Sequence, residues 1–188
     1  IDNDNDNSQI NITSKSLDNN ILHPHVAFKY EFINTLNSLL NFNETVEKIR
    51  NVMNDPKNFN KFKGIVKANN KKHLMQLITT GIKILGNDGN FNWIDTSEIT
   101  DMSVLFRNKS KFNGHIELWD VSKVTSMGGM FYGAESFNQP IGKWDVSNVD
   151  NMGYMFAGCD SFNQDISKWN VSKVTCMNFM FKHAICFN

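Results

Sequence analysis

The sequence predicts an α+β repeat protein: a solenoid of about 25-residue units with short parallel strands, preceded by an N-terminal helical region. Three observations predict this fold class. Tryptophan recurs at a fixed interval in the C-terminal half, other apolar residues recur at fixed offsets from each tryptophan, and the preceding segment carries apolar residues at helical spacing.

Residues 1–20 are expected to be a flexible polar segment, because they are rich in Asn, Asp and Ser and have no apolar periodicity. Residues 21–70 are expected to be a helical region. Apolar stripes predict helices at about Val26 to Leu40 and Glu44 to Met53, and a third that opens at Asp55-Pro56 and carries Phe59, Phe62, Ile65 and Val66. Two arrangements fit these helices: part of a cap on the solenoid, or a separate small bundle.

Residues 71–92 are expected to form a capping helix and a turn. An open solenoid exposes the apolar side chains of its first unit, so a terminal element must cover them. A helix at about Lys71 to Leu85 suits this role, since it carries an apolar stripe and Gly86 can end it. The stripe consists of Leu74, Leu77, Ile78, Gly81, Ile82 and Leu85.

Residues 93–188 are expected to form the repeats, divided as 93–118, 119–143, 144–168 and a truncated 169–188. Trp119, Trp144 and Trp169 are spaced 25 residues apart, and the first unit begins at Trp93 with one extra residue, Ile94. With tryptophan as position zero, Val recurs at positions two and five, Met at eight, Met-Phe at eleven and twelve, and Phe-Asn at eighteen and nineteen. One unit cannot bury this apolar set, whereas stacked units can.

Spacing within a unit predicts its local structure. Val, Met and Phe at positions five, eight and twelve are helically spaced, which predicts a short helix or 3₁₀ turn over Thr125 to Tyr132. Trp and Val at positions zero and two alternate as in a strand, so Trp144-Asp145-Val146 is expected to be extended and to pair in parallel with its neighbours at about 4.8 Å. Two polar columns are expected to bond the backbone at turns. These are Ser97, Ser122, Ser147 and Ser172, and Asn113, Asn138, Asn163 and Asn188.

Several classes of function lack support. The formal net charge is zero, so there is no basic surplus for nucleic acid. The longest apolar stretch, His73 to Leu85, is short and interrupted by Lys83, so no transmembrane segment is expected. Three cysteines do not make a disulfide framework, and reduced thiols are expected. Without a nucleophile–base pair or a Gly-rich phosphate loop, the protein is expected not to be an enzyme and to use no cofactor.

No metal site is expected either. Asp2, Asp4 and Asp6 begin like a calcium loop, but Asn7 and Thr13 stand where Gly and Glu are needed. His23 and His25 flank Pro24 without further ligands at suitable spacing, which favours a loop.

One column predicts a binding surface. Position ten holds Val104, Gly129, Tyr154 and Phe179 and is expected to point at least partly outward between buried methionines. Tyr154 and Phe179 would then lie side by side as an aromatic strip of the kind that anchors interfaces. The alternative is lateral packing against the next unit. The candidate partner-binding residues are Tyr154, Phe179 and two from the variable column at position thirteen, Tyr132 and Lys182.

The pattern W-D-V-S-x-V-x-x-M-x-x-M-F…F-N-Q-x-I-x-x-W, as it stands from Trp119 to Trp144, resembles the BspA-like leucine-rich repeats of mycoplasma-type surface lipoproteins. The resemblance covers about Lys71 to Asn188. It implies a leucine-rich-repeat-like solenoid in a bacterial, host-associated surface protein that takes part in attachment, with no catalytic residues to carry over.

The expected function is therefore a non-catalytic cell-surface recognition or adhesion module that binds a protein or glycan on a host cell or matrix. The alternative is an intracellular protein–protein interaction scaffold or effector that uses the same solenoid. The chain starts at Ile1 without a Met and stops at Asn188 in mid-pattern. An anchor or signal, and further repeats, are therefore expected outside it.

Overall fold

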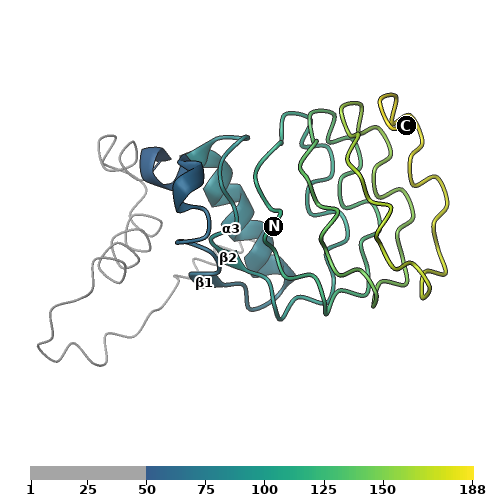
Figure 1. The fold of residues 1–188 in the computed structure, drawn as a ribbon, viewed down its shortest axis with the longest axis horizontal. Coiled ribbons are helices and arrows are strands. Elements are labelled where there is room, and N and C mark those ends of the chain that lie inside the picture. The colour runs from purple at the N-terminus through teal and green to yellow at the C-terminus, as the bar shows by residue number, and fades with distance from the viewer. Residues whose placement is uncertain (1–49) are drawn as a thin grey trace, which may run out of the picture. The chain divides into compact units, whose positions relative to one another are not determined.

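The structure, a computed structural model, describes residues 50–188. Its regular elements include the 3₁₀ helix η1 (Pro56–Asn58), strand β1 (Val66–Lys67), helix α3 (Lys71–Leu85) and strand β2 (Ile94–Asp95). Most of the remaining backbone forms turns and irregular segments that lie side by side along the C-terminal part (Figure 1). The expected polar segment 1–20, both metal hypotheses and the helix at Val26 to Leu40 lie outside the described residues. So does most of the helix at Glu44 to Met53, of which residues 50–54 are helical.

The helix predicted after Asp55 is wrong beyond its first turn. Asp55 caps η1 as expected, accepting a hydrogen bond from the Lys57 N–H, and Pro56 occupies the first turn. The chain then turns until Val66, where β1 pairs in parallel with β2 and Val66 lies opposite Ile94. The reason is tertiary: the N–H groups of Gly64, Val66 and Ala68 donate to the carbonyls of Asn92, Trp93 and Asp95. Pairing with the first unit therefore prevails over the helical spacing of the apolar residues.

Helix α3 has the predicted bounds. Asn70 accepts from the His73 N–H at the start, and Gly86, at φ 83°, ends it in the left-handed region that favours glycine. Five of the six residues predicted for its apolar stripe are buried, and Ile84 is buried where Ile82 was expected. A Cβ at Gly81 would lie 2.7 Å from Phe91 and 3.3 Å from Trp93, so the helix packs closely on the first unit.

Of the two alternatives predicted over Thr125 to Tyr132, a continuous helix is absent, and the segment forms turns with hydrogen bonds three residues back, as the 3₁₀-turn alternative requires. Alternate N–H groups of this segment bond in two directions. Those of Met127, Gly129, Phe131 and Gly133 donate to carbonyls 24 residues ahead, at Asn151, Gly153, Met155 and Ala157. Those of Met130, Tyr132 and Ala134 donate three residues back, to Met127, Gly129 and Phe131. Half of the backbone donors thus join one unit to the next, and a continuous helix cannot form.

The strand expected at Trp144-Asp145-Val146 is absent from the described chain. The Trp144 backbone N–H donates to the Ile141 carbonyl, and Asp145 accepts from the Ser147 N–H at 3.1 Å, so the three residues lie between two turns, at 142–143 and 147–148. Parallel pairing between units occurs instead at position seven, as isolated bridges that join Asp101, Ser126, Asn151 and Cys176 in succession. The parallel direction of the pairing between units was predicted correctly, but its position within the unit was not.

Aromatic rings form the core. Phe106, Phe131, Phe156 and Phe181 stack with centroids 5.3, 5.5 and 5.6 Å apart. A second column runs beside them at 5.8–6.2 Å spacing, made of Phe112, Phe137, Phe162 and Phe187. The two columns meet at 3.9–4.1 Å within each unit. Burying one such ring contributes roughly 1.5–3 kcal/mol, so this cluster dominates the stability of the described fold.

The asparagine column bonds the backbone, as predicted, whereas in the serine column the preceding Asp or Asn side chain makes the bond and the Ser122 hydroxyl donates to the Asp120 carboxylate. The Ser122 N–H donates to the Asp120 carboxylate, and the Ser172 N–H donates to Asn170 with the same geometry, so the exchange of Asp for Asn keeps the turn. Asn113, Asn138 and Asn163 each accept from the backbone N–H of the asparagine one unit later, at 2.9–3.2 Å. The described fold is thus mostly irregular, with few short elements, one short parallel sheet and a large buried aromatic cluster. The domain boundaries drawn from the sequence stay predictions.

Candidate binding surface

Three exposed aromatic residues lie in a row on the surface, and we call Tyr132, Tyr154 and Phe179 the aromatic ridge. The ring centroids of Tyr132 and Tyr154 are 6.4 Å apart, and those of Tyr154 and Phe179 are 5.1 Å apart. Their exposed fractions are 38%, 38% and 55%, in contrast to the fully buried phenylalanines of the core. The strip expected from position ten therefore exists, and Tyr132 extends it.

The backbone turns these side chains outward. Val104, Gly129, Tyr154 and Phe179, all at position ten, have φ between 55° and 59°. A residue with a Cβ pays about 1–2 kcal/mol in this left-handed region, whereas glycine does not. Gly129 demonstrates that the fold accepts glycine here. Tyr154 and Phe179 therefore keep large exposed side chains at positions where the left-handed backbone is strained for any residue other than glycine.

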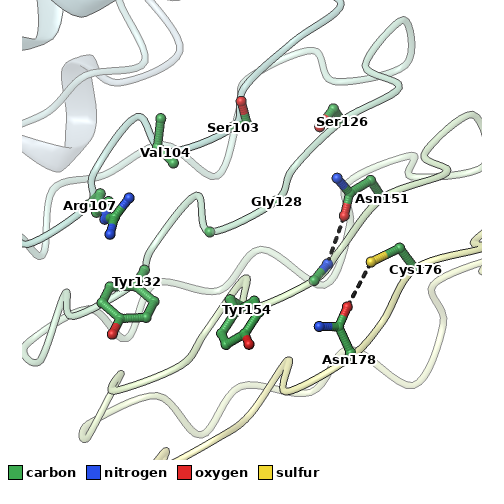
Figure 2. A pocket seen from close by; sticks show the side chains of 12 residues that line it. Ser103, Val104, Arg107, Ser126, Gly128, Tyr132, Asn151, Tyr154, Cys176 and Asn178 are labelled. Atoms are coloured by element: carbon green, nitrogen blue, oxygen red, sulfur yellow. Dashed lines mark hydrogen bonds between the residues drawn. The ribbon is translucent and has the colours of Figure 1, made fainter.

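A groove of about 650 Å³ is lined by two residues of the ridge, Tyr132 and Tyr154, and we call it the main groove. Figure 2 shows Tyr132 and Tyr154 on one side of it and short polar side chains on the other. Its lining contains no carboxylate, and Arg107 is its one charged residue. The lining consists of Ser103, Val104, Arg107, Ser126, Gly128, Gly129, Tyr132, Asn151, Gly153, Tyr154, Cys176 and Asn178.

The polar part of the main groove is held by local hydrogen bonds. Asn151 Oδ1 accepts from the Gly153 N–H at 3.0 Å, and the Cys176 thiol donates to Asn178 Oδ1 at 2.8 Å (Figure 2). A Cβ at Gly128 would lie 3.0 Å from the Asn151 amide nitrogen, and one at Gly153 would lie 3.0 Å from Asn178 Oδ1. Glycines therefore make room for the amide side chains of the following unit.

A second groove, of about 370 Å³, lies along the other side of Tyr132 and Tyr154. Unlike the main groove it is lined by charges of both signs, from Glu135, Asp160 and Lys182. Lys182 Nζ lies 5.4 Å from the ring centroid of Phe179, within the range of a cation–π contact. All four residues predicted from the sequence thus belong to one surface.

Several residues of this surface were not predicted. They are Val104, which belongs to position ten, and Arg107, Asn151 and Asn178, and all four line the main groove. Arg107 lies 5.2 Å from the ring centroid of Tyr132 and occupies position thirteen of the first unit, the column of Tyr132 and Lys182. Extending that column one unit back would have found it.

Other reactive groups do not add a chemical site to the described part of the chain. Cys159, Cys176 and Cys186 are free thiols, of which Cys159 is buried and Cys186 is exposed. Burial raises the pKa of the Cys159 thiol to about 12, and the thiol donates to the Phe131 carbonyl. Within residues 50–188, His, Cys, Asp and Glu side chains form no group of three that could hold a metal ion, and no helix is long and apolar enough to cross a membrane.

A family model described as "Mycoplasma protein of unknown function, DUF285" matches residues 75–188. The chain belongs to the DUF285 family. The DUF285 match includes every residue of the aromatic ridge and of both grooves. No curated protein and no solved structure gives a significant match.

Proposed function

We propose that this DUF285 protein is a non-catalytic recognition or adhesion module of the cell surface, which binds a protein or glycan of a host cell or matrix through the aromatic ridge and its grooves. The observation that carries the proposal is the ridge itself. Three exposed aromatic side chains form one surface, and two of them have the left-handed backbone that Gly129 adopts at the same position of an earlier unit. Maintained strain of this kind is typical of functional positions.

We further propose that the units act as coils of a leucine-rich-repeat-like solenoid of the BspA type. Support comes from the hydrogen bonds and parallel bridges that join each unit to the next, and from the two stacked phenylalanine columns. A solenoid repeats one surface at regular intervals, so residues at one position form a continuous strip. The aromatic ridge is such a strip, built from positions ten and thirteen.

Location is the first test. Intact cells that produce the full-length protein are treated briefly with protease, and the released peptides are identified by mass spectrometry. Surface exposure predicts that peptides from 119–188 are released without lysis, while peptides of an abundant cytosolic enzyme are not. Release only after lysis would overturn the adhesion proposal and favour the intracellular scaffold, for which a pull-down is the next experiment.

A further inference from the structure

The main groove combines exposed aromatic faces with short polar side chains. Its apolar contacts come from the exposed rings of Tyr132 and Tyr154 and from Val104, and its polar contacts come from amides and hydroxyls. The methionines beneath the floor, Met127 and Met152, are fully buried. A ligand in the groove therefore meets flat aromatic faces and short polar groups, and no deep apolar pocket is formed by these residues.

We infer that the main groove binds a neutral oligosaccharide that runs along the aromatic ridge, an inference that rests on the proposed recognition function. A pyranose ring has an apolar C–H face that packs on an aromatic face, and hydroxyls at its edge that both donate and accept hydrogen bonds. Tyr and Phe supply rigid faces of this kind, and Tyr adds a polar hydroxyl. Rings 5.1 and 6.4 Å apart along the ridge allow successive sugar residues to contact successive side chains.

The polar groups of the groove suit sugar hydroxyls. Asn151 and Asn178 each use their Oδ1 atom in a local hydrogen bond, which fixes the orientation of the amide. In Figure 2 the amide nitrogen of Asn178 lies on the side where Tyr154 is drawn, and that of Asn151 lies on the side where Ser126 is drawn. An oriented amide can donate to a hydroxyl without further ordering, and it contributes specificity in the way that a few fixed polar groups do in small-molecule sites.

Charge argues against a basic ligand. No carboxylate lines the main groove, so a basic peptide has no counter-charge there. The one cation, Arg107, lies over the Tyr132 ring at 5.2 Å, where it widens the platform beside the ridge. The charged residues of this surface, Glu135, Asp160 and Lys182, line the second groove instead.

The backbone argues against an added peptide strand. Peptides that extend a sheet need free N–H and C=O groups along its edge. Here the N–H groups of Gly129 and Tyr154 donate to the carbonyls of Gly153 and Asn178, so these groups already join neighbouring units. Recognition in the groove then depends on side chains, which favours a sugar chain over an extended polypeptide.

The test uses the 188-residue chain on an array of neutral and acidic mammalian glycans, with immobilised fibronectin and collagen beside it. We expect saturable binding to at least one neutral oligosaccharide. For that oligosaccharide, Tyr154→Gly and Phe179→Gly are expected to weaken binding by about tenfold or more, and Asn178→Ala by roughly fivefold, by titration calorimetry. The matched control is Met75→Ala, which removes an exposed apolar side chain, 42% exposed, from α3 and should bind like the wild type.

The outcomes are separable. The inference is overturned if the chain binds only acidic glycans, only fibronectin or collagen, or if both glycine variants bind the neutral oligosaccharide as tightly as the wild type. Binding to the matrix proteins alone, lost in Tyr154→Gly, would sink the sugar inference and leave the recognition function intact. If the chain binds neither glycans, matrix proteins nor intact host cells, the proposed function falls as well. Circular dichroism of each variant shows that it is folded.

Discussion

Tyr154 and Phe179 occupy the same position in successive units, and their rings lie 5.1 Å apart on backbone that is left-handed at both residues. The pair combines two features that stability alone does not favour: exposed aromatic surface and a φ that glycine adopts more easily. Gly129, one unit earlier, has nearly the same φ without a side chain. The comparison shows that this left-handed turn does not itself depend on an aromatic side chain.

Replacing Tyr154 by Gly should therefore change stability little. Relief of left-handed strain, about 1–2 kcal/mol, opposes the loss of the side chain's partial burial, so the free energy of unfolding should change by less than about 1 kcal/mol. Urea unfolding followed by circular dichroism measures this. A loss of 3 kcal/mol would show that the tyrosine is a structural residue, packed laterally as the alternative interpretation has it.

The core position two residues away should behave oppositely. Phe156 is fully buried and stacks on Phe131, Phe162 and Phe181, so Phe156→Ala opens a cavity that links three rings. Such truncations cost about 3–5 kcal/mol. The same urea experiment should show a midpoint far below that of Tyr154→Gly. Equal midpoints for the two variants would contradict the division into core and ridge.

The sequence was most informative where identical residues recur. The periods of Trp, Val, Met and Phe located the units and the outward column of Tyr154 and Phe179, because repeated packing demands repeated side chains. It also located α3, where a helical stripe coincides with a cap at Asn70 and a stop at Gly86. In the repeat columns and in α3, the structure favoured by the local sequence is also the one that tertiary packing favours.

Local backbone structure was not predictable from the same spacing. Val, Met and Phe at intervals of three and four residues resemble a helix, yet alternate N–H groups of this segment bond the next unit. Val66 was assigned to a helix because its strand partner, Ile94, lies far along the chain. The grooves could not be predicted from the sequence either. Their lining residues, such as Arg107 and Asn178, belong to separate units and line one groove only because the units stack.

The asparagine ladder should contribute measurably to stability. Asn138 Oδ1 accepts from the Asn163 N–H at 3.0 Å and from Gln164 Nε2 at 2.9 Å. Asn138→Ala removes this acceptor and should lower the free energy of unfolding by about 1–2 kcal/mol. Asn60→Ala, at an exposed position, is the control and should lose less than about 0.5 kcal/mol. If thermal melts show the same loss of unfolding free energy for both variants, the hydrogen bonds of the asparagine ladder do not stabilise the fold.

The contact between α3 and the first unit should weaken in acid. Lys71 Nζ lies 2.9 Å from Asp101 Oδ2. Burial acts to raise the pKa of the Asp101 carboxyl, but hydrogen bonds from Lys71 and Ser103 and the charge of Lys71 together hold that pKa below its usual 3.8. Because the folded-state pKa is depressed, the stabilisation is present above the unfolded pKa and is lost as pH falls through the folded value.

Asp101→Asn tests this linkage, since the amide keeps an oxygen for the Ser103 N–H while removing the charge. The free energy of unfolding of the wild type should exceed that of Asp101→Asn at pH 7, and the difference should shrink as pH falls below about 3.8. Urea titrations at several pH values give both quantities. A difference that is constant from pH 7 to pH 2.5 would mean that the ion pair does not stabilise the fold.

Thiol reactivity should report the packing of the third unit. Burial raises the pKa of Cys159 to about 12, whereas Cys186 is exposed. Because the thiolate is the reactive form, Cys159 should be the slowest of the three cysteines to react with iodoacetamide at pH 8, and Cys186 should react readily. Peptide mass spectrometry after timed quenching assigns each rate. In Phe156→Ala, Cys159 should react faster because the cavity loosens the core around its thiol. Rapid labelling of Cys159 in the wild type would contradict the buried environment that the stacked units create.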